Sequence, residues 1–229
     1  MLTRAEITAR LADVRGRIAD ATRRSGRAKE TVTLVLASKT QSPETIRIAY
    51  DSGERNFGEN YVQEAATKRA AMGSLETIRW HLIGHLQTNK VKLAVSIFDL
   101  IHSLDSVRLA TALARAHPTP SVRVLIEVNL AGEPSKTGVA PDAIDALIDS
   151  VRDKVDIFGL MTIPPAGGTP ESSRPHFAQL RELRDRLAAH TGLALSELSM
   201  GMSDDFDIAI EEGATIVRVG RAIFGERRR

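Results

Sequence analysis

Cysteine is absent from this 229-residue chain. Disulfide bonds, thiolate metal sites and a cysteine nucleophile are therefore excluded. An excess of charge of either sign is nearly absent as well: the formal net charge is +2, and the three terminal arginines at 227–229 account for it. A body this close to neutrality lacks the clustered basic stripe that nucleic acid requires, so we expect no nucleic-acid partner.

Long apolar runs are also missing. No segment is long and apolar enough to cross a membrane, and none follows a basic N-terminus as in a secretion signal. The arginine-rich N-terminal stretch is interrupted by acidic residues, and it carries apolar residues at helical spacing: Ile7, Leu11, Val14 and Ile18. Thr3 and Glu6 form a capping-box pattern before it. We expect a helix of the fold rather than a transit peptide, no membrane partner and a cytoplasmic protein.

Short β-branched runs alternate with segments of helical period along the rest of the chain. The expected strands are residues 32–38, 55–58, 78–84, 99–103, 121–129, 156–163, 194–200 and 215–220. The expected helices include 43–52, 61–72, 106–116, 142–151 and 174–190. Strand followed by helix, repeated, indicates parallel strands with right-handed crossovers.

Eight such strands predict an α/β fold, a single (β/α)₈ TIM barrel domain over residues 1–229. The N-terminal helix would then cover the face that a final helix normally takes. The stretch 164–175, rich in Pro, Gly and Ser, is expected to be a long loop after the sixth strand. An open six-stranded sheet is the alternative.

Polar residues or glycines stand at the end of every expected strand. In a barrel these ends face the active site. After the seventh strand comes SMGMSDD, and the end of the eighth reads RVGRAIFG. Small residues before a helical turn often hold phosphate through backbone N–H groups, and Gly201 and Gly220 would permit a close approach. In the alternative, Ser203 or Asp204 caps the helix at 205–212, and Gly220 relieves crowding. Two such loops on adjacent strands favour phosphate.

Lys39 ends the first strand, on the same rim as these loops. A lysine at a strand end often extends over the core with its amine in water. With a phosphate cradle and an arginine beside it, however, Lys39 fits a phosphorylated aldehyde, because a neutral amine forms a Schiff base and burial beside a cation lowers the pKa of a lysine. Pyridoxal phosphate is one such aldehyde, and the phosphorylated sugar of a Schiff-base aldolase is the alternative.

Six stretches resemble one known family. They are LASKT, NFGENYVQE, WHLIGHLQTNK, EVNLAGEPSKTG, GLMTIPP and LSMGMSDDFDIAIEEGATIVRVGRAIFG, and they run from near residue 34 to residue 225. They are similar to the pyridoxal phosphate homeostasis proteins of the YggS/PROSC type, whose fold matches the N-terminal barrel of alanine racemase. The resemblance implies a protein that binds pyridoxal 5'-phosphate (PLP) and takes part in its intracellular homeostasis and delivery. Apo PLP-dependent enzymes would be the transient acceptors.

The resemblance also implies which residues bind the cofactor: Lys39, Asn60, Met200, Ser203, Arg218, Gly220 and Arg221. Lys39 carries PLP covalently as a Schiff base, and Arg218 faces the pyridine nitrogen. Ser203, Gly220 and the backbone of Arg221 hold the phosphate. Asn60 and Met200 line the ring.

We expect no substantial catalysis, with a PLP-dependent amino-acid racemase as the alternative. A racemase needs a base on each face of the bound substrate. In racemases the base opposite the lysine is a tyrosine from a second domain. Here the only tyrosines are Tyr50, a packing residue, and Tyr61, a rim residue. Arg218 accepts no proton, so the ring would be a poorer electron sink, which disfavours decarboxylation and transamination more than racemisation. An open barrel mouth would also leave the site in contact with water, where electrostatic stabilisation is weak.

Three further features stay open in the sequence. Lys136, in the loop GEPSKTG, is either a solvated lysine or a second amine that takes over the aldehyde for delivery. His81 and His85 would share one face of a strand, but two histidines make a poor metal site, so we expect hydrogen-bonding histidines and no metal. Trp80 is expected in the core. Since no apolar helix face is spare, we expect a monomer.

Overall fold

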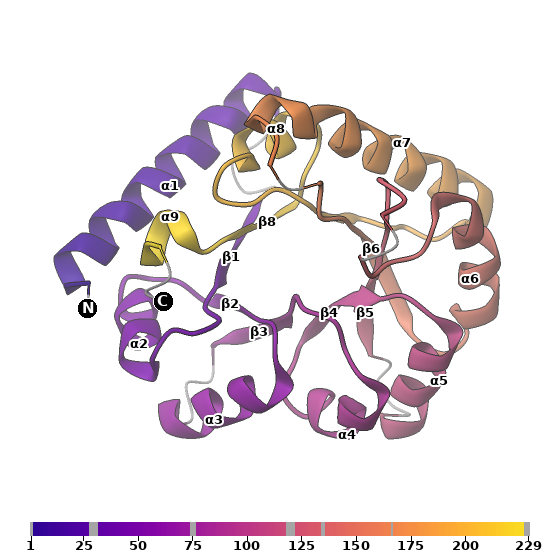
Figure 1. Cartoon of the computed structure of the whole chain (residues 1–229), viewed down its shortest axis with the longest axis horizontal. Coiled ribbons are helices and arrows are strands. Elements are labelled where there is room, and N and C mark those ends of the chain that lie inside the picture. Colours follow the sequence, from indigo (N-terminus) through magenta and orange to yellow (C-terminus); the bar gives the residue numbers. More distant parts are fainter. Residues whose placement is uncertain are drawn as a thin grey trace.

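Eight parallel strands close into a barrel in the computed structural model, which describes residues 2–27, 32–73, 77–117, 122–133, 136–165 and 167–226. The strands are β1 (Thr33–Ala37), β2 (Asn56–Glu59), β3 (Arg79–Leu82), β4 (Leu100–Leu104), β5 (Arg123–Glu127), β6 (Asp156–Met161), β7 (Glu197–Ser199) and β8 (Ile216–Val219). Neighbours in sequence pair with each other, and β1 pairs with β8 to close the ring. The predicted (β/α)₈ barrel is confirmed, and the open sheet is wrong (Figure 1).

Helices surround the barrel. They are α1 (Arg4–Arg24), α2 (Pro43–Asp51), α3 (Val62–Met72), α4 (Val91–Ala94), α5 (Val107–Ala116), α6 (Ile144–Val151), α7 (Arg174–Thr191), α8 (Phe206–Glu211) and α9 (Arg221–Phe224). The expected strand ends agree within three residues and the expected helix ends within two. The sequence did not predict α4, because four residues are too few to show a helical period. The expected loop at 164–175 ends in a 3₁₀ turn, Pro170–Ser173, and in the start of α7; Ala166 lies outside the described residues.

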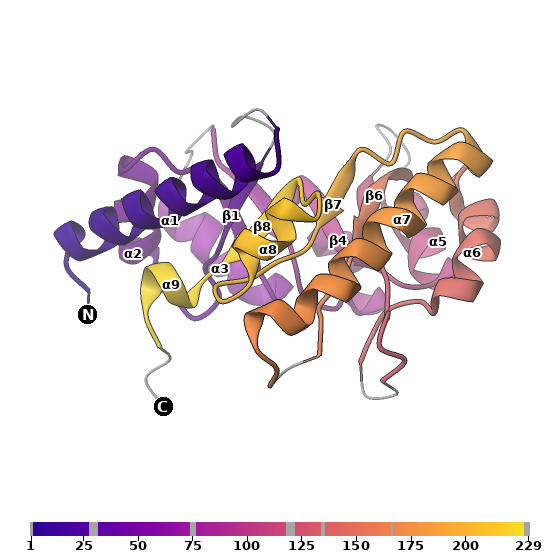
Figure 2. The same cartoon turned by 90° about the horizontal axis from the view of Figure 1, so that it is seen from above.

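The N-terminal helix takes the place of a final barrel helix. Its capping box is present, since Glu6 N donates to Thr3 Oγ1 and Thr3 N donates to Glu6 Oε2. Its apolar stripe is buried, and the helix packs against α2, α8 and α9 (Figures 1 and 2). An ion pair between Arg17 and Asp207 fastens it to α8. No helix in the described part of the chain is long and apolar enough to span a membrane.

The barrel interior changes from apolar to polar along the strands. A small apolar cluster separate from the main core is formed by Val35, Leu100, Leu125, Met161 and Ile216. Two residues farther along three of these strands stand His102, Glu127 and Arg218, all buried. Because side chains two apart on a strand face the same way, an apolar layer lies below a polar layer. The buried polar groups therefore gather towards the C-terminal ends of the strands.

Candidate functional site

A cavity of about 690 Å³ opens at the C-terminal ends of β1 and β8. Five of the seven residues predicted to bind the cofactor line it: Lys39, Ser203, Arg218, Gly220 and Arg221. They come from the loops after β1 and β7, from β8 itself and from the start of α9, which the parallel barrel brings to one rim. The structure thus joins an amine, a hydroxyl and two guanidinium groups in one place.

Lys39 is half-buried and lies two residues after the end of β1, with Ser38 between them. The strand register sets Val35 opposite Arg218, four residues before Lys39. The next residue, Thr40, has a left-handed backbone with φ of 67°. A β-branched residue rarely adopts this conformation, so the turn after Lys39 must be held by its surroundings.

Ser203 faces the first turn of α9. Its Oγ accepts a hydrogen bond of 3.2 Å from Ala222 N, and no side chain caps the start of α8. The alternative that Ser203 or Asp204 caps that helix is therefore wrong. Asp204 instead pairs with the Arg221 side chain.

The two loop glycines have different physical reasons. A Cβ at Gly220 would lie 3.0 Å from the backbone oxygen of Ala37, so glycine allows β8 to end close against β1 at the cavity. Gly201 has φ of 90°, and a Cβ there would lie 2.5 Å from Cβ of Ala209 in α8. Packing on α8 accounts for Gly201 without a ligand.

Arg218 is buried beneath the cavity. Its Nη1 donates to Ser199 Oγ at 2.6 Å, and its Nη2 donates to the carbonyl of Thr162 at 2.9 Å. Burial lowers the pKa of Arg218 to about 10, an effect that the charges of Glu127 and Asp205 oppose. The guanidinium is therefore charged at neutral pH and acts as a donor only.

A buried hydrogen-bonded chain continues from Arg218 across the barrel. His102 Nδ1 lies 2.9 Å from Ser199 Oγ, and His81 Nε2 lies 3.2 Å from Asn56 Oδ1. Burial lowers the pKa of His81 to about 4 and that of His102 well below its usual value. Both rings are therefore neutral at neutral pH. The sequence alone did not predict that His102 and Ser199 belong to this hydrogen-bonded series.

The two histidines singled out in the sequence have different surroundings. His81 is a satisfied hydrogen-bonding residue, as predicted. The expectation that His85 shares its strand face is wrong, because β3 ends at Leu82; His85 lies partly exposed beyond it, with Nδ1 3.3 Å from Asp105 Oδ2. Within the described ranges, no three His, Asp or Glu side chains are placed to hold a metal ion.

Asn60, Met200 and Lys136 do not line the cavity. Asn60 follows β2 at the same end of the barrel, and its buried Oδ1 has no hydrogen-bond partner, so an acceptor remains available there. Met200 is fully buried in the main core. Ring contacts by these two residues stay predictions. The Lys136 amine donates to Glu133 Oε1 and to the carbonyl of Pro164, and so connects the loop after β5 to the loop after β6. Residues 134 and 135, between Glu133 and Lys136, lie outside the described residues.

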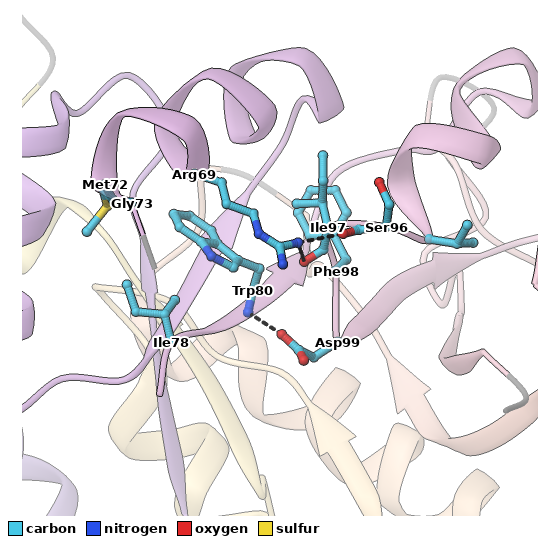
Figure 3. Close-up of a pocket in the computed structure, with 10 residues that line it drawn as sticks. Arg69, Met72, Gly73, Ile78, Trp80, Ser96, Ile97, Phe98 and Asp99 are labelled. Carbon is cyan, nitrogen blue, oxygen red and sulfur yellow. Dashed lines mark hydrogen bonds between the residues drawn. The ribbon is translucent and has the colours of Figure 1, made fainter. Parts of the chain in front are cut away.

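A second cavity, of about 420 Å³, lies at the opposite end of the barrel, where β3 and β4 begin (Figure 3). Arg69 donates to the carbonyls of Ser96 and Ile97, and Asp99 accepts from the backbone N–H of Trp80. Trp80 is buried, as expected. Since these polar groups already hold helix–strand connections together, this cavity is the weaker candidate for a functional site.

Comparisons with known proteins identify the family. The family model described as alanine racemase, N-terminal domain, matches residues 11–228. A pyridoxal phosphate homeostasis protein of Aquifex aeolicus is 49% identical over 223 residues, 96% of this chain and 97% of the relative. One from Escherichia coli is 40% identical over 233 residues, covering 97% of each chain.

Solved structures show the same similarity. PipY of Synechococcus elongatus, solved with PLP bound, is 39% identical and superposes with a TM-score of 0.85, covering 96% of this chain and 100% of PipY. An alanine racemase of Clostridium difficile is only 12% identical, with a TM-score of 0.74 over 98% of this chain and 58% of the racemase. That distant likeness concerns the fold alone.

Proposed function

Because this chain belongs to the pyridoxal phosphate homeostasis protein family, which shares the barrel of the alanine racemase N-terminal domain, we propose that it binds PLP as a Schiff base on Lys39. Its role is to hold the cofactor for intracellular homeostasis and delivery, without substantial catalysis. The observation that carries this proposal is the cavity that Lys39 shares with Ser203, Gly220 and Arg221. Apo PLP-dependent enzymes are the proposed acceptors, and the protein acts as a cytoplasmic monomer.

The residues in the cavity suit both ends of the cofactor. PLP would supply an aldehyde, and the Lys39 amine is the group in the cavity that would hold it as a Schiff base. Ser203 supplies a hydroxyl beside the start of α9, where it accepts from Ala222 N–H, and the backbone of Arg221 follows Gly220 at the same rim. The Arg221 side chain adds positive charge at the same rim, although Asp204 and Glu226 neutralise part of it. Together they suit a phosphate dianion.

Arg218 sets the chemistry available at the ring. Its burial and its two donated hydrogen bonds hold it beneath the cavity. If Arg218 faced the pyridine nitrogen, its charged donor would leave no proton on that atom, and the ring would withdraw electrons less strongly than with a carboxylate partner. Such an arrangement disfavours decarboxylation and transamination more than racemisation.

Neither tyrosine lines the cavity, which further supports a carrier. Tyr50 lies half-buried with its hydroxyl 3.0 Å from Thr77 Oγ1. Tyr61 is 64% exposed at the start of α3, a rim position. Lys136 also lies outside the cavity, which favours a structural role over hand-over of the aldehyde.

Absorbance spectroscopy tests the binding mode. Wild type and Lys39→Ala are purified, stripped of cofactor and mixed with PLP, and spectra are recorded before and after borohydride. We expect a visible Schiff-base band that borohydride removes in wild type and that is missing in Lys39→Ala. An identical band in both proteins would place the bond elsewhere.

Turnover separates the carrier from a racemase. The PLP-loaded protein is incubated with a panel of single-enantiomer amino acids, and the opposite enantiomer is quantified. A rate of about one per second or more is ordinary enzymatic turnover and would make the protein a racemase. For a carrier we expect no measurable racemisation, together with reactivation of an apo PLP-dependent enzyme by the loaded protein.

A further inference from the structure

We propose that a buried ionic cluster of Lys68, Glu59 and Glu64, the Lys68 cluster, is a positioning device for Lys39. It lies behind the end of β1, between β2 and α3, and outside the cavity itself. The inference rests on the proposed function, since it assigns a role in delivering the Lys39 amine.

The Lys68 ammonium uses all three of its protons inside the protein. Its Nζ donates to Glu59 Oε1 at 2.8 Å, to Glu64 Oε1 at 2.6 Å and to the carbonyl of Ser38 at 2.8 Å. Its side chain is 6% exposed, and that of Glu59 is fully buried. An amine held in this way has a fixed position and is not itself available as a nucleophile.

The cluster grips the backbone on both sides of Lys39. On one side, Lys68 holds the carbonyl of Ser38, and the Ser38 hydroxyl donates to Glu59 Oε1 at 2.6 Å. On the other side, the N–H of Thr40 donates to Glu64 Oε1 at 2.6 Å. Lys39 therefore stands on a short segment whose two neighbouring residues are both attached to one ionic group.

The grip explains the strained turn. Thr40 adopts its left-handed φ at the residue whose N–H is bound to Glu64. Charge-assisted hydrogen bonds are about twice as strong as neutral ones, so this contact can maintain a conformation that threonine disfavours. The conformation directs the chain from β1 into the loop that leads to α2.

Stability alone does not account for the cluster. Burying charges removes them from water, and apolar residues of similar size often serve a fold equally well. Burial indeed raises the pKa of Glu59, and its second carboxylate oxygen has no hydrogen-bond partner. Lys68 also occupies the buried stripe of α3 alongside Val62, Ala65 and Met72, where an apolar residue would be the simpler choice. The cluster contacts the segment that bears the reactive amine, which gives it a function.

The kinetic test compares variants of the cluster with a matched control. Lys68→Met and Glu64→Leu remove the two grips, and Lys68→Arg retains a cation with donors. Glu54→Gln is the control, because Glu54 is a carboxylate with only 3% of its side chain exposed, paired with Arg15 at 2.7 Å, and it does not touch the Lys39 segment. Schiff-base formation after mixing apo protein with PLP is followed by absorbance, and unfolding by circular dichroism.

We expect Lys68→Met and Glu64→Leu to form the Schiff base roughly tenfold to a hundredfold more slowly, since a misplaced reacting group loses its effective concentration. Lys68→Arg should recover part of the rate. Glu54→Gln should form it at the wild-type rate even where its stability loss matches that of the other variants. If Lys68→Met does not fold, Glu64→Leu decides, because the Glu64 side chain is 26% exposed and its loss is better tolerated.

A second readout needs no cofactor. Amide exchange of Thr40, measured by NMR on the apo protein, should accelerate in Glu64→Leu and stay unchanged in Glu54→Gln. Equal Schiff-base rates in wild type and both cluster variants would overturn the inference while leaving the proposed function in place. Failure of wild type itself to form a Schiff base would overturn the proposed function, and the positioning role with it.

Discussion

His81 Nδ1 lies 3.0 Å from His102 Nε2 inside the barrel, with the two rings edge to face at 70°. Because both rings are neutral, one nitrogen must donate and the other accept. Asn56 Oδ1 only accepts, so His81 carries its proton on Nε2 and takes a hydrogen bond from His102 Nε2–H. His102 Nδ1 then accepts from the Ser199 hydroxyl, which itself accepts from Arg218. This series of hydrogen bonds therefore requires that both histidines are neutral.

This requirement predicts a pH-dependent stability. The pKa of His81 falls from 6.5 to about 4 on folding, so its contribution is complete above pH 6.5 and is lost as the pH falls towards 4. Between pH 7.5 and pH 5, wild type should lose about 2 kcal/mol of unfolding free energy more than His81→Gln. Urea unfolding of both proteins at the two pH values measures the difference.

The comparison with His81→Gln removes the contributions of other groups whose titration changes stability in the opposite direction. Burial raises the pKa values of Glu59 and Glu127, so these carboxyls favour the folded state as the pH falls. They are present in both proteins. An equal loss of unfolding free energy in wild type and His81→Gln between the two pH values would contradict the conclusion that His81 is neutral in the folded protein.

Ser203→Ala should weaken PLP binding. The hydroxyl sits at the start of α9 within the cavity, and a hydrogen bond to a charged group contributes about 1.5–3 kcal/mol, or roughly tenfold to a hundredfold in affinity. Pyridoxal, which has the aldehyde but no phosphate, is the matched ligand, and its affinity should not change. Fluorescence titration with both ligands measures the effect. An equal loss for both would mean that the serine does not bind phosphate.

Gly159→Ala should destabilise the barrel. A Cβ at Gly159 would lie 1.8 Å from the backbone oxygen of Glu197 on the adjacent strand β7, so β6 and β7 would have to separate. We expect a loss of about 3 kcal/mol in thermal or urea unfolding. The control is Gly16→Ala in α1, where nothing lies within 4 Å of the added atom and helix propensity predicts a gain of roughly 0.5–1 kcal/mol. Similar effects for the two substitutions would contradict the strand contact.

The sequence predicted the barrel well because its signals are local. β-branched runs, helical periods and the Thr3–Glu6 cap each lie within a few residues, and their order implies parallel pairing. The lysine on β1 and the loops after β7 and β8 could likewise be placed on one rim, since strand ends share a face in a barrel.

The buried polar groups could not be predicted in the same way. His102 and Ser199 are 97 residues apart in sequence, and their contact depends on the register of the whole ring. In the sequence Lys68 is indistinguishable from an ordinary helix lysine, and only the structure shows that it donates to the Ser38 carbonyl and to Glu59. Met200 follows Ser199 directly, but neighbouring side chains of an extended segment point to opposite faces, so Met200 is buried in the main core instead of facing the barrel interior.

The central claim is one covalent bond, and mass spectrometry tests it most directly. PLP-loaded protein is treated with borohydride, digested with protease and mapped for peptides that carry the reduced pyridoxyl group. We predict a single modified site at Lys39, with Lys68 and Lys136 unmodified. A modification at another lysine, or none after full loading, would contradict the account.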